Sequence, residues 1–426
     1  MLIKLAYGDD HLTCDVPDNW INGRCYRPHP LPACADVRAE LMSALASLPS
    51  GQTLREIGDE KADCVIAVEP DVPAILHDAL PALIEMIEDE TTLDSSHITI
   101  LVANRVLNPI TPSMLPELIP AEIREHYRVV LHNPFSKEKV VSLGESSRKV
   151  PLTVDSMYRD AELKIVLSSV RPDMLLGFTG ARSVVLPGLS GKETLRSLYS
   201  FNNVADRNAR YGWFRDNPFH ITGIEATNAA GCDLAVNVVT SPTGQISRVF
   251  AGHFGQSQVL AMNHLREGML VKVKEPMDVV VTSIGSYPGG DTMTALVNTL
   301  SAVSSVLKPE GTIVITAKLT DGFGPPELAR LFETRGTVKE AVDRLSASKK
   351  FVPGQWLAQR LYSVLQSHEV ILYNTYQDED VLWGAGFTPA QDINQAVHEA
   401  MQSHGQKCKI VALPEGPAGI GEIVAP

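Results

Sequence analysis

The sequence predicts an α/β fold of two domains, each with a largely parallel sheet flanked by helices. Short runs rich in β-branched residues alternate with longer amphipathic runs, which is the pattern of strands joined by crossover helices. The chain has 426 residues, a length that suits two or three domains, and 44% of its residues are hydrophobic. That composition is sufficient for a sizeable core in each domain and excludes a mainly disordered chain.

The predicted strands are short apolar runs bounded by polar or turn-forming residues. In chain order they are Cys64–Glu69, Ile98–Ala103, Arg128–Leu131, Lys164–Val170, Asp233–Val239, Asp278–Ile284, Thr312–Ala317, Glu369–Tyr373 and Lys409–Leu413.

The predicted helices are the longer amphipathic runs between these strands. They are Asp36–Leu48, Val72–Glu88, Lys192–Ser200, Gln256–Met269, Thr292–Leu307, Thr337–Ala347, Pro353–Ser367 and Pro389–Ser403. Capping chemistry places some of their ends: Asp291 and Thr388 are predicted to cap the helices that follow them, and Gly405 is predicted to end the last one.

The domain boundary is predicted at Val271–Pro276, a polar stretch that ends in proline between a predicted helix and an apolar strand. Residues 1–270, joined by the C-terminal segment 405–426, are then expected to form the first domain, and residues 277–404 the second. Because α/β proteins often hold ligands between domains, we expect a ligand cleft there.

Charge and hydropathy exclude several kinds of partner. The 37 basic and 50 acidic side chains give a net charge of −13, which argues against binding to a nucleic-acid backbone. No apolar run approaches the roughly 20 residues of a membrane span, and acidic residues follow the N-terminus too closely for a signal sequence. We expect a cytoplasmic protein with a small-molecule carboxylate ligand and no membrane partner; the sequence is compatible with a homo-oligomer.

One group of metal-ligand residue types occurs near the N-terminus: His11, Cys14, Cys25, His29 and Cys34. Imidazole and thiolate groups are what zinc or nickel prefers, but this spacing fits no standard structural zinc site. We therefore expect no metal site. Six cysteines without a Cys-x-x-Cys pair indicate buried thiols in a reducing compartment.

A glycine-bearing loop, Gly177–Gly188, follows the predicted strand Lys164–Val170, at the position where α/β sheets bind ligands. Gly180 lets the backbone approach a ligand, Arg182 offers a planar fork for a carboxylate or phosphate, and Ser183 adds a hydroxyl. The alternative is a structural turn that carries a surface arginine.

A second loop, Gly285–Thr292, follows a predicted strand and opens a predicted helix, where free N–H groups bind anions. Tyr287 and Asp291 are therefore candidate ligand-binding residues, although Asp291 is equally suited to cap the helix. A third loop, Asp321–Gly324, carries the same two interpretations.

Four further side chains are candidates with ordinary structural alternatives. His220 and His253 are the histidines expected nearest a cleft, although a lone histidine is more often a hydrogen-bonded structural residue. Gln355 and Trp356 pair an amide with a large aromatic ring at a predicted helix start, where the tryptophan also suits simple packing.

In chain order these loops resemble the nickel-pincer lactate racemase family, from about residue 60 to the C-terminus. Five motifs in the same order carry the resemblance: Gly177-Phe178-x-Gly180-x-Arg182 with Leu186-Pro187-Gly188; Asn237-Val238-Val239 with Phe250-Ala251-Gly252; Gly285-x-Tyr287-Pro288; Asp321-Gly322-x-Gly324; and Gln355-Trp356.

The resemblance implies two α/β domains with a nickel-pincer nucleotide between them. In the family, separate maturation proteins make this cofactor, which is joined through a thioamide to a lysine. It accepts a hydride from Cα of a 2-hydroxy acid while a histidine takes the hydroxyl proton, and the hydride then returns to the other face. Such chemistry needs a covalent anchor, two bases and a cation for the carboxylate.

This sequence departs from the family at the positions that carry that chemistry. Ser183 stands at the anchoring lysine, and Asp173 and Leu107 stand at the two catalytic histidines. Tyr199 replaces a further histidine, and Asn298 replaces the lysine of the second domain. The family's Asp-x-Thr-Arg-Pro segment corresponds to Glu69-Pro70-Asp71-Val72-Pro73, which has lost the arginine.

The favoured hypothesis is a lactate racemase-like protein that binds a small 2-hydroxy or keto acid without the covalent cofactor. The expected ligand-binding residues are Gly180, Arg182, Ser183, Tyr287, Asp291, Asn298, Gln355 and Trp356. The second hypothesis is a racemase, epimerase or related isomerase with Asp173 as base, Tyr199 or Ser183 as donors and a non-covalent cofactor. An unrelated α/β enzyme or nucleotide binder is the third, but no intact nucleotide motif is present.

Overall fold

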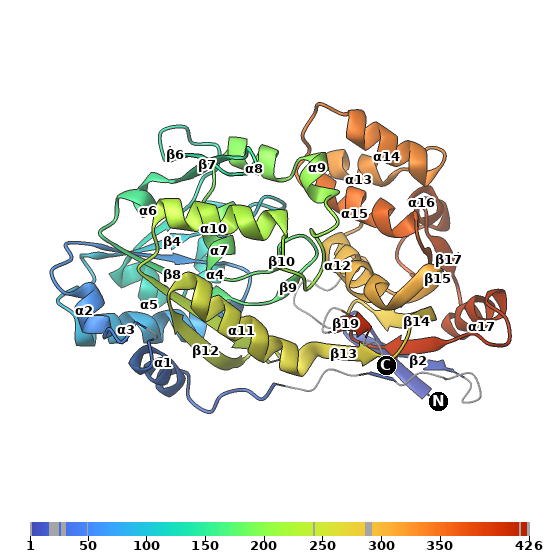
Figure 1. Cartoon of the computed structure of the whole chain (residues 1–426), viewed down its shortest axis with the longest axis horizontal. Coiled ribbons are helices and arrows are strands. Elements are labelled where there is room, and N and C mark those ends of the chain that lie inside the picture. The colour runs from blue at the N-terminus through green and yellow to red at the C-terminus, as the bar shows by residue number, and fades with distance from the viewer. Residues whose placement is uncertain are drawn as a thin grey trace. The chain divides into compact units, whose positions relative to one another are not determined.

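The computed structural model describes residues 2–16, 25–26, 31–48, 50–241, 243–285, 292–416 and 419–423. The chain forms two compact units, and their elements are labelled in Figure 1. The six-stranded unit comprises residues 30–209 and 213–265, and the five-stranded unit comprises residues 1–29, 210–212 and 266–426. Both are α/β with mostly parallel sheets flanked by helices, which confirms the predicted fold class.

The six-stranded sheet has the order β12-β11-β8-β3-β4-β5, and all its pairings are parallel except that of β12 with β11. The strands are β3 (Cys64–Val68), β4 (Ile98–Val102), β5 (Arg128–Leu131), β8 (Leu163–Ser169), β11 (Leu234–Thr240) and β12 (Ile246–Gly252). All but β12 were predicted.

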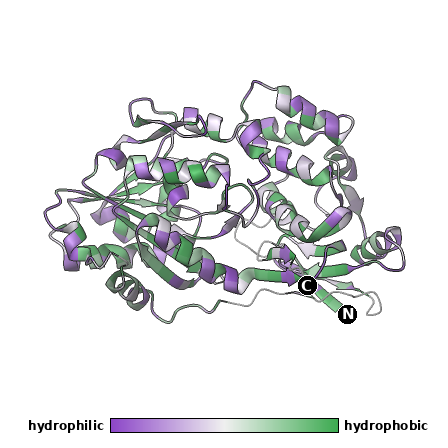
Figure 2. Ribbon diagram, in the orientation of Figure 1, coloured by the Kyte–Doolittle hydropathy of each residue, from purple (hydrophilic) through white to green (hydrophobic). Residues whose placement is uncertain are grey.

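Alternate residues of these strands build two cores, one on each face of the sheet. Cys64, Ile66 and Val68 of β3 join the core that includes α1 (Val37–Ala46) and α3 (Leu80–Glu90). Val65 and Ala67 join the core on the other face, beside α6 (Ser156–Asp160), α7 (Ala181–Ser183) and α10 (Pro218–Ala230). Burial on both faces explains why these strands read as continuous apolar runs, which appear green in Figure 2.

Smaller elements complete this unit, including two short hairpins. They are α2 (Leu54–Gly58), α4 (Leu115–Leu118), α5 (Ala121–His126), β6 (Val140–Glu145) with β7 (Pro151–Asp155), β9 (Pro172–Asp173) with β10 (Gly177–Phe178), α8 (Lys192–Leu198), α9 (Phe201–Val204) and the start of α11 (Phe254–Met269).

The five-stranded sheet is wholly parallel, with the order β17-β16-β15-β14-β18. Its strands are β14 (Met277–Ser283), β15 (Leu307–Thr316), β16 (Glu369–Tyr373), β17 (Thr388–Ala390) and β18 (Ile410–Leu413). The antiparallel hairpin of β1 (Leu2–Tyr7) and β2 (Asp10–Asp15) shares one core with β14 and α17 (Ile393–Ser403).

The remaining elements of this unit are helices and one further strand pair. They are α12 (Met293–Val303), α13 (Pro326–Ala329), α14 (Val338–Ala347), α15 (Gln355–Leu365), α16 (Glu379–Gly384) and the parallel pair β13 (Leu270–Val273) and β19 (Ile420–Ile423). None of the helices in the described ranges combines the length and apolar composition that a bilayer span requires.

The predicted domain limits need correction at both ends of the chain. The segment 405–426, predicted to join the N-terminal domain, belongs to the five-stranded unit because β18 pairs with β14. The first 29 residues belong there too, since Ile3 and Leu5 of β1 pack against Val279 and Val281 of β14. The first half of the predicted linker Val271–Pro276 lies in β13, which pairs with β19.

Two predicted helix caps are also wrong. Residue 388 lies in β17, and the cap of α17 is Asp392, whose carboxylate accepts hydrogen bonds from two backbone N–H groups. The cap of α12 is Thr292, whose hydroxyl accepts from the Ala295 N–H, while Asp291 lies outside the described residues. Gly405 does follow the end of α17, with a φ of +79°.

Candidate functional site

The strand order of the six-stranded sheet reverses between β3 and β8, because the chain runs from β3 to β4 and β5 on one side and returns to β8 on the other. Open α/β sheets bind ligands beyond the carboxyl ends of the strands at such a switch point. Glu69 follows β3 there, and its Oε1 accepts a hydrogen bond from the Ser169 N–H at 2.8 Å. Its Oε2 lies 3.7 Å from Arg171 Nη2. Burial raises the pKa of Glu69, an effect that Arg171 opposes.

Asp173 lies a few residues past β8, in β9, and closes a tight turn. Its Oδ1 accepts hydrogen bonds from the backbone N–H groups of Leu175 (2.8 Å) and Leu176 (2.7 Å). Burial, and then the charge of Asp173, raise the pKa of the Tyr199 hydroxyl. The two predicted catalytic residues therefore lie near each other, and Tyr199 stays protonated at physiological pH.

Gly180 and Ser183 form a closed loop at the start of α7. The Ser183 hydroxyl donates to the Gly180 carbonyl at 2.7 Å and accepts from the Gly180 N–H at 3.1 Å. Gly180 has a φ of +141°, and a Cβ there would lie 2.5 Å from Cδ of Gln258. Position 180 therefore requires glycine, and the serine side chain is committed to the loop.

Asn237, in the Asn237-Val238-Val239 motif of β11, ties α7 to the sheet. Its Oδ1 accepts from the Ala181 N–H and from the Ser168 hydroxyl, both at 3.0 Å. Its Nδ2 donates to the Ser257 hydroxyl of α11 at 2.9 Å. One fully buried amide thus connects β8, β11, α7 and α11.

Replacing Asn237 by alanine is expected to destabilise the protein by about 2–3 kcal/mol, because the buried Ala181 N–H loses its acceptor. Ligand binding should weaken as well, since Ala181 precedes Arg182. Urea unfolding and ligand titration measure the two effects. Asn203→Ala removes an amide that also donates two hydrogen bonds in this unit and serves as the control; equal effects of the two changes would contradict a special role for Asn237.

Arg182 on α7 is buried, with 5% of the residue exposed. Its guanidinium forms no hydrogen bond or ion pair with the residues that the structure describes, and Nη2 is completely shielded from solvent. Burial lowers the pKa of Arg182 to about 9. The alternative of a surface arginine on a structural turn is therefore wrong.

His220 lies on the first turn of α10, a helix that the sequence analysis did not predict. Asn217 caps this helix by accepting from the N–H groups of Phe219 (2.9 Å) and His220 (3.2 Å). Asn217 Nδ2 also donates to the Leu175 carbonyl at 2.8 Å, which ties α10 to the Asp173 turn. Burial, and then the charge of Arg182, lower the pKa of His220 to about 3.

The predicted site residues fall into three groups. Asp173, Gly180, Arg182, Ser183 and Tyr199 lie in the six-stranded unit, together with His220. Asn298 on α12, and Gln355 and Trp356 on α15, lie in the five-stranded unit. Tyr287 and Asp291 lie outside the described residues. The functional roles of all three groups stay predictions.

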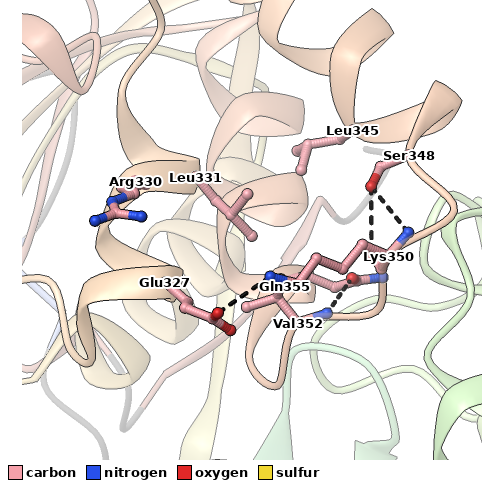
Figure 3. A pocket seen from close by; sticks show the side chains of 8 residues that line it. All are labelled: Glu327, Arg330, Leu331, Leu345, Ser348, Lys350, Val352 and Gln355. Carbon is pink, nitrogen blue, oxygen red and sulfur yellow. Dashed lines mark hydrogen bonds and ion pairs between the residues drawn. The ribbon is translucent and has the colours of Figure 1, made fainter.

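Gln355 lines a cavity of about 200 Å³ within the five-stranded unit, which Figure 3 shows from close by. Its Oε1 accepts a hydrogen bond from the Val352 N–H at 2.9 Å. Lys350 Nζ donates to Glu327 Oε1 at 3.1 Å across the same cavity. The charges of Lys350 and Glu327 neutralise each other, and the second basic side chain of the lining is Arg330.

The predicted metal-ligand residues that the structure describes are divided between the two units. His11, Cys14 and Cys25 belong to the five-stranded unit and Cys34 to the six-stranded unit, while His29 lies outside the described residues. Within the described ranges, no three His, Cys, Asp or Glu side chains are arranged to hold a metal ion.

Three features of this site were not predicted from the sequence. They are the helix α10, its cap Asn217 and the packing of Gln258 against Gly180. Asn217-Pro218 is a recognisable start signal, an N-cap followed by proline at the first helical position, and it would have revealed α10. No local signal marks Gln258.

Two family models match the chain. Residues 7–212 match the lactate racemase N-terminal domain, and residues 272–423 match the lactate racemase C-terminal domain. The chain belongs to the lactate racemase family. It is 24% identical to the lactate racemase of Thermoanaerobacterium thermosaccharolyticum over 418 residues, which is 97% of each chain. It is also 24% identical to the lactate racemase of Lactiplantibacillus plantarum over 354 residues, 83% of each.

Solved structures agree with this family at the level of the fold. The lactate racemase apoprotein of T. thermosaccharolyticum superposes with a TM-score of 0.91 at 24% identity, over 99% of this chain and 100% of that one. A crystal structure of a protein from Thermotoga maritima has a TM-score of 0.64 at 13% identity, over 94% of this chain and 100% of that one.

Proposed function

We propose that this member of the lactate racemase family binds a small 2-hydroxy or keto acid through Arg182 and works without a lysine-anchored nickel-pincer nucleotide. The buried guanidinium carries the proposal. An uncompensated buried charge costs several kcal/mol, and a bound carboxylate relieves that cost through two parallel hydrogen bonds to the guanidinium fork. In a chain of net charge −13, an acidic ligand needs such a local cation.

The residues at the family's cofactor position do not fit a covalently held nucleotide. Ser183 has no amine for a thioamide link, and its hydroxyl already makes two hydrogen bonds with Gly180. Leu107, at the position of one family histidine, cannot transfer a proton.

The rival reading, an active racemase, epimerase or related isomerase with Asp173 as base, has weaker support. Oδ1 of Asp173 already accepts hydrogen bonds from two backbone N–H groups and so is committed to closing its own turn. This reading would be favoured instead if the wild-type protein exchanges the Cα proton of lactate and the Asp173→Asn variant does not.

The absence of a covalent cofactor is tested by intact-protein mass spectrometry and nickel analysis after co-expression with the family's maturation proteins. We expect the mass given by the sequence and no stoichiometric nickel, because position 183 lacks the anchoring amine. The T. thermosaccharolyticum lactate racemase, expressed in the same way, is the positive control.

A covalent adduct or one nickel per chain would contradict the proposal, provided that the control carries its cofactor. Titration of the same preparation with lactate and pyruvate tests binding. Failure of both acids to bind would overturn the ligand assignment even if the mass is unmodified.

A further inference from the structure

His220 and Arg182 lie on two helices, α10 and α7, that pack against each other. A Cβ added to Gly223 of α10 would lie 3.5 Å from Cβ of Arg182, so this face of α10 packs on α7 at ordinary contact distance. His220 lies three residues before Gly223 and therefore on the same face of the helix. The charge of Arg182 acts on the imidazole, as expected for neighbouring groups.

The imidazole of His220 has hydrogen-bonding capacity that the described part of the chain does not use. Neither ring nitrogen makes a hydrogen bond there, although the ring packs 5.6 Å from the Phe214 ring and the backbone is fixed by the Asn217 cap. The residue is partly exposed, unlike Arg182. Because its pKa is about 3, the imidazole is neutral at physiological pH, with one donor and one acceptor nitrogen.

We propose that His220 recognises the oxygen on C2 of the acid whose carboxylate pairs with Arg182, and so makes the site selective for 2-hydroxy and 2-keto acids over unsubstituted acids. This inference rests on the proposed function. C2 is bonded directly to the carboxylate carbon, so a side chain beside the guanidinium is placed to reach its substituent.

A neutral imidazole suits both kinds of ligand. It accepts a hydrogen bond from a 2-hydroxyl group and donates one to a 2-keto oxygen. An uncharged ring also leaves the carboxylate to Arg182, so the two side chains divide recognition of the ligand between its charge and its C2 oxygen.

Ligand-observed NMR titrations at pH 7.5 with lactate, pyruvate and propionate test this division. For His220→Phe we expect about tenfold weaker binding of lactate and pyruvate and unchanged binding of propionate, because only the C2 oxygen loses its partner. His220→Gln, which keeps a donor and an acceptor, should retain part of the preference. His126→Phe, a change at an exposed histidine at the end of α5 in the same unit, should leave all three affinities unchanged.

An equal loss of affinity for all three acids in both His220 variants would show that the residue only maintains the structure. Unchanged affinities would show that it does not contact the ligand. Either result overturns the inference. The proposed function fails differently, if wild-type protein binds none of the acids or if Arg182→Met binds them normally. Circular dichroism tests whether each variant is folded. If His220→Phe does not fold, the affinities of His220→Gln decide the question.

Discussion

Replacing Arg182 by methionine is expected to weaken binding of lactate or pyruvate at least about thirtyfold, while the ligand-free protein becomes as stable as the wild type or more stable. The first effect follows because truncating one partner of a buried charge pair costs about 2–5 kcal/mol. The second follows because the guanidinium has no partner in the described ranges, and a methionine of similar shape removes its desolvation cost. Ligand titration and urea unfolding measure the two effects.

The pH dependence of this stability difference has a definite sign. The pKa of Arg182 is about 9 in the folded protein and higher in the unfolded chain, so the unfolded chain binds the proton more tightly. Burying the charged Arg182 guanidinium lowers the stability of the wild-type protein by its full amount below pH 9. This destabilisation becomes smaller as the pH rises above 9. The stability advantage of Arg182→Met should therefore narrow above pH 9.

Arg248→Met is the matched control for charge. Arg248 lies on β12 of the same unit, its side chain is 58% exposed, and it pairs with Glu40 at 3.1 Å. Its loss changes the net charge equally but should leave binding unchanged and stability within about 1 kcal/mol. If the two variants behave alike, the role of Arg182 reduces to general electrostatics and the site assignment is wrong.

Replacing Gly177 by alanine is expected to destabilise the protein by more than about 3 kcal/mol and to abolish ligand binding. Gly177 has a φ of +74°, and a Cβ there would lie 1.9 Å from the Trp213 carbonyl oxygen, which is backbone and cannot rotate away. That oxygen accepts a hydrogen bond from Asn217 Nδ2 at 3.0 Å, so its displacement disturbs the start of α10 and with it His220. Urea unfolding and lactate titration report the two losses.

Gly144→Ala separates backbone strain from the steric clash. Gly144 has a φ of +96°, but nothing lies within 4 Å of an added Cβ. The substitution should therefore lower the free energy of unfolding by only about 1 kcal/mol, because alanine disfavours a positive φ, and it should leave binding unchanged. Similar stability of the Gly177 and Gly144 variants would contradict the close approach of the Trp213 backbone.

The central strands were predictable because a strand that is buried on both faces has a continuous apolar sequence. Cys64–Val68 and Ile98–Val102 are each one residue shorter than predicted, and Glu369–Tyr373 and the edge strand Arg128–Leu131 have the predicted bounds. Helix α10 was missed because apolar and small residues occur all around it, so its few polar residues do not form the continuous polar stripe of a surface helix.

Long-range pairings were not predictable from local pattern. β18 pairs with β14, from which it is separated by more than a hundred residues. β1, at the N-terminus, packs on β14, which is also distant in sequence, so the residues next to each strand do not indicate its partner. These pairings place residues 1–29 and 405–426 in the five-stranded unit.

The candidate site was found in part for the same reason. Glycine and arginine at 180 and 182 marked the loop directly, since glycine signals an unusual backbone and arginine signals an anion. The burial of Arg182 and its electrostatic effect on His220 depend on how α7 packs against α10, which no local motif reveals.

The most direct test of this account is a crystal structure of protein co-expressed with the family's maturation proteins and soaked with lactate. The account predicts a carboxylate within hydrogen-bonding distance of the Arg182 guanidinium and an unmodified Ser183 whose hydroxyl still contacts Gly180. A ligand bound away from Arg182, or a nucleotide covalently attached to the chain, would contradict it.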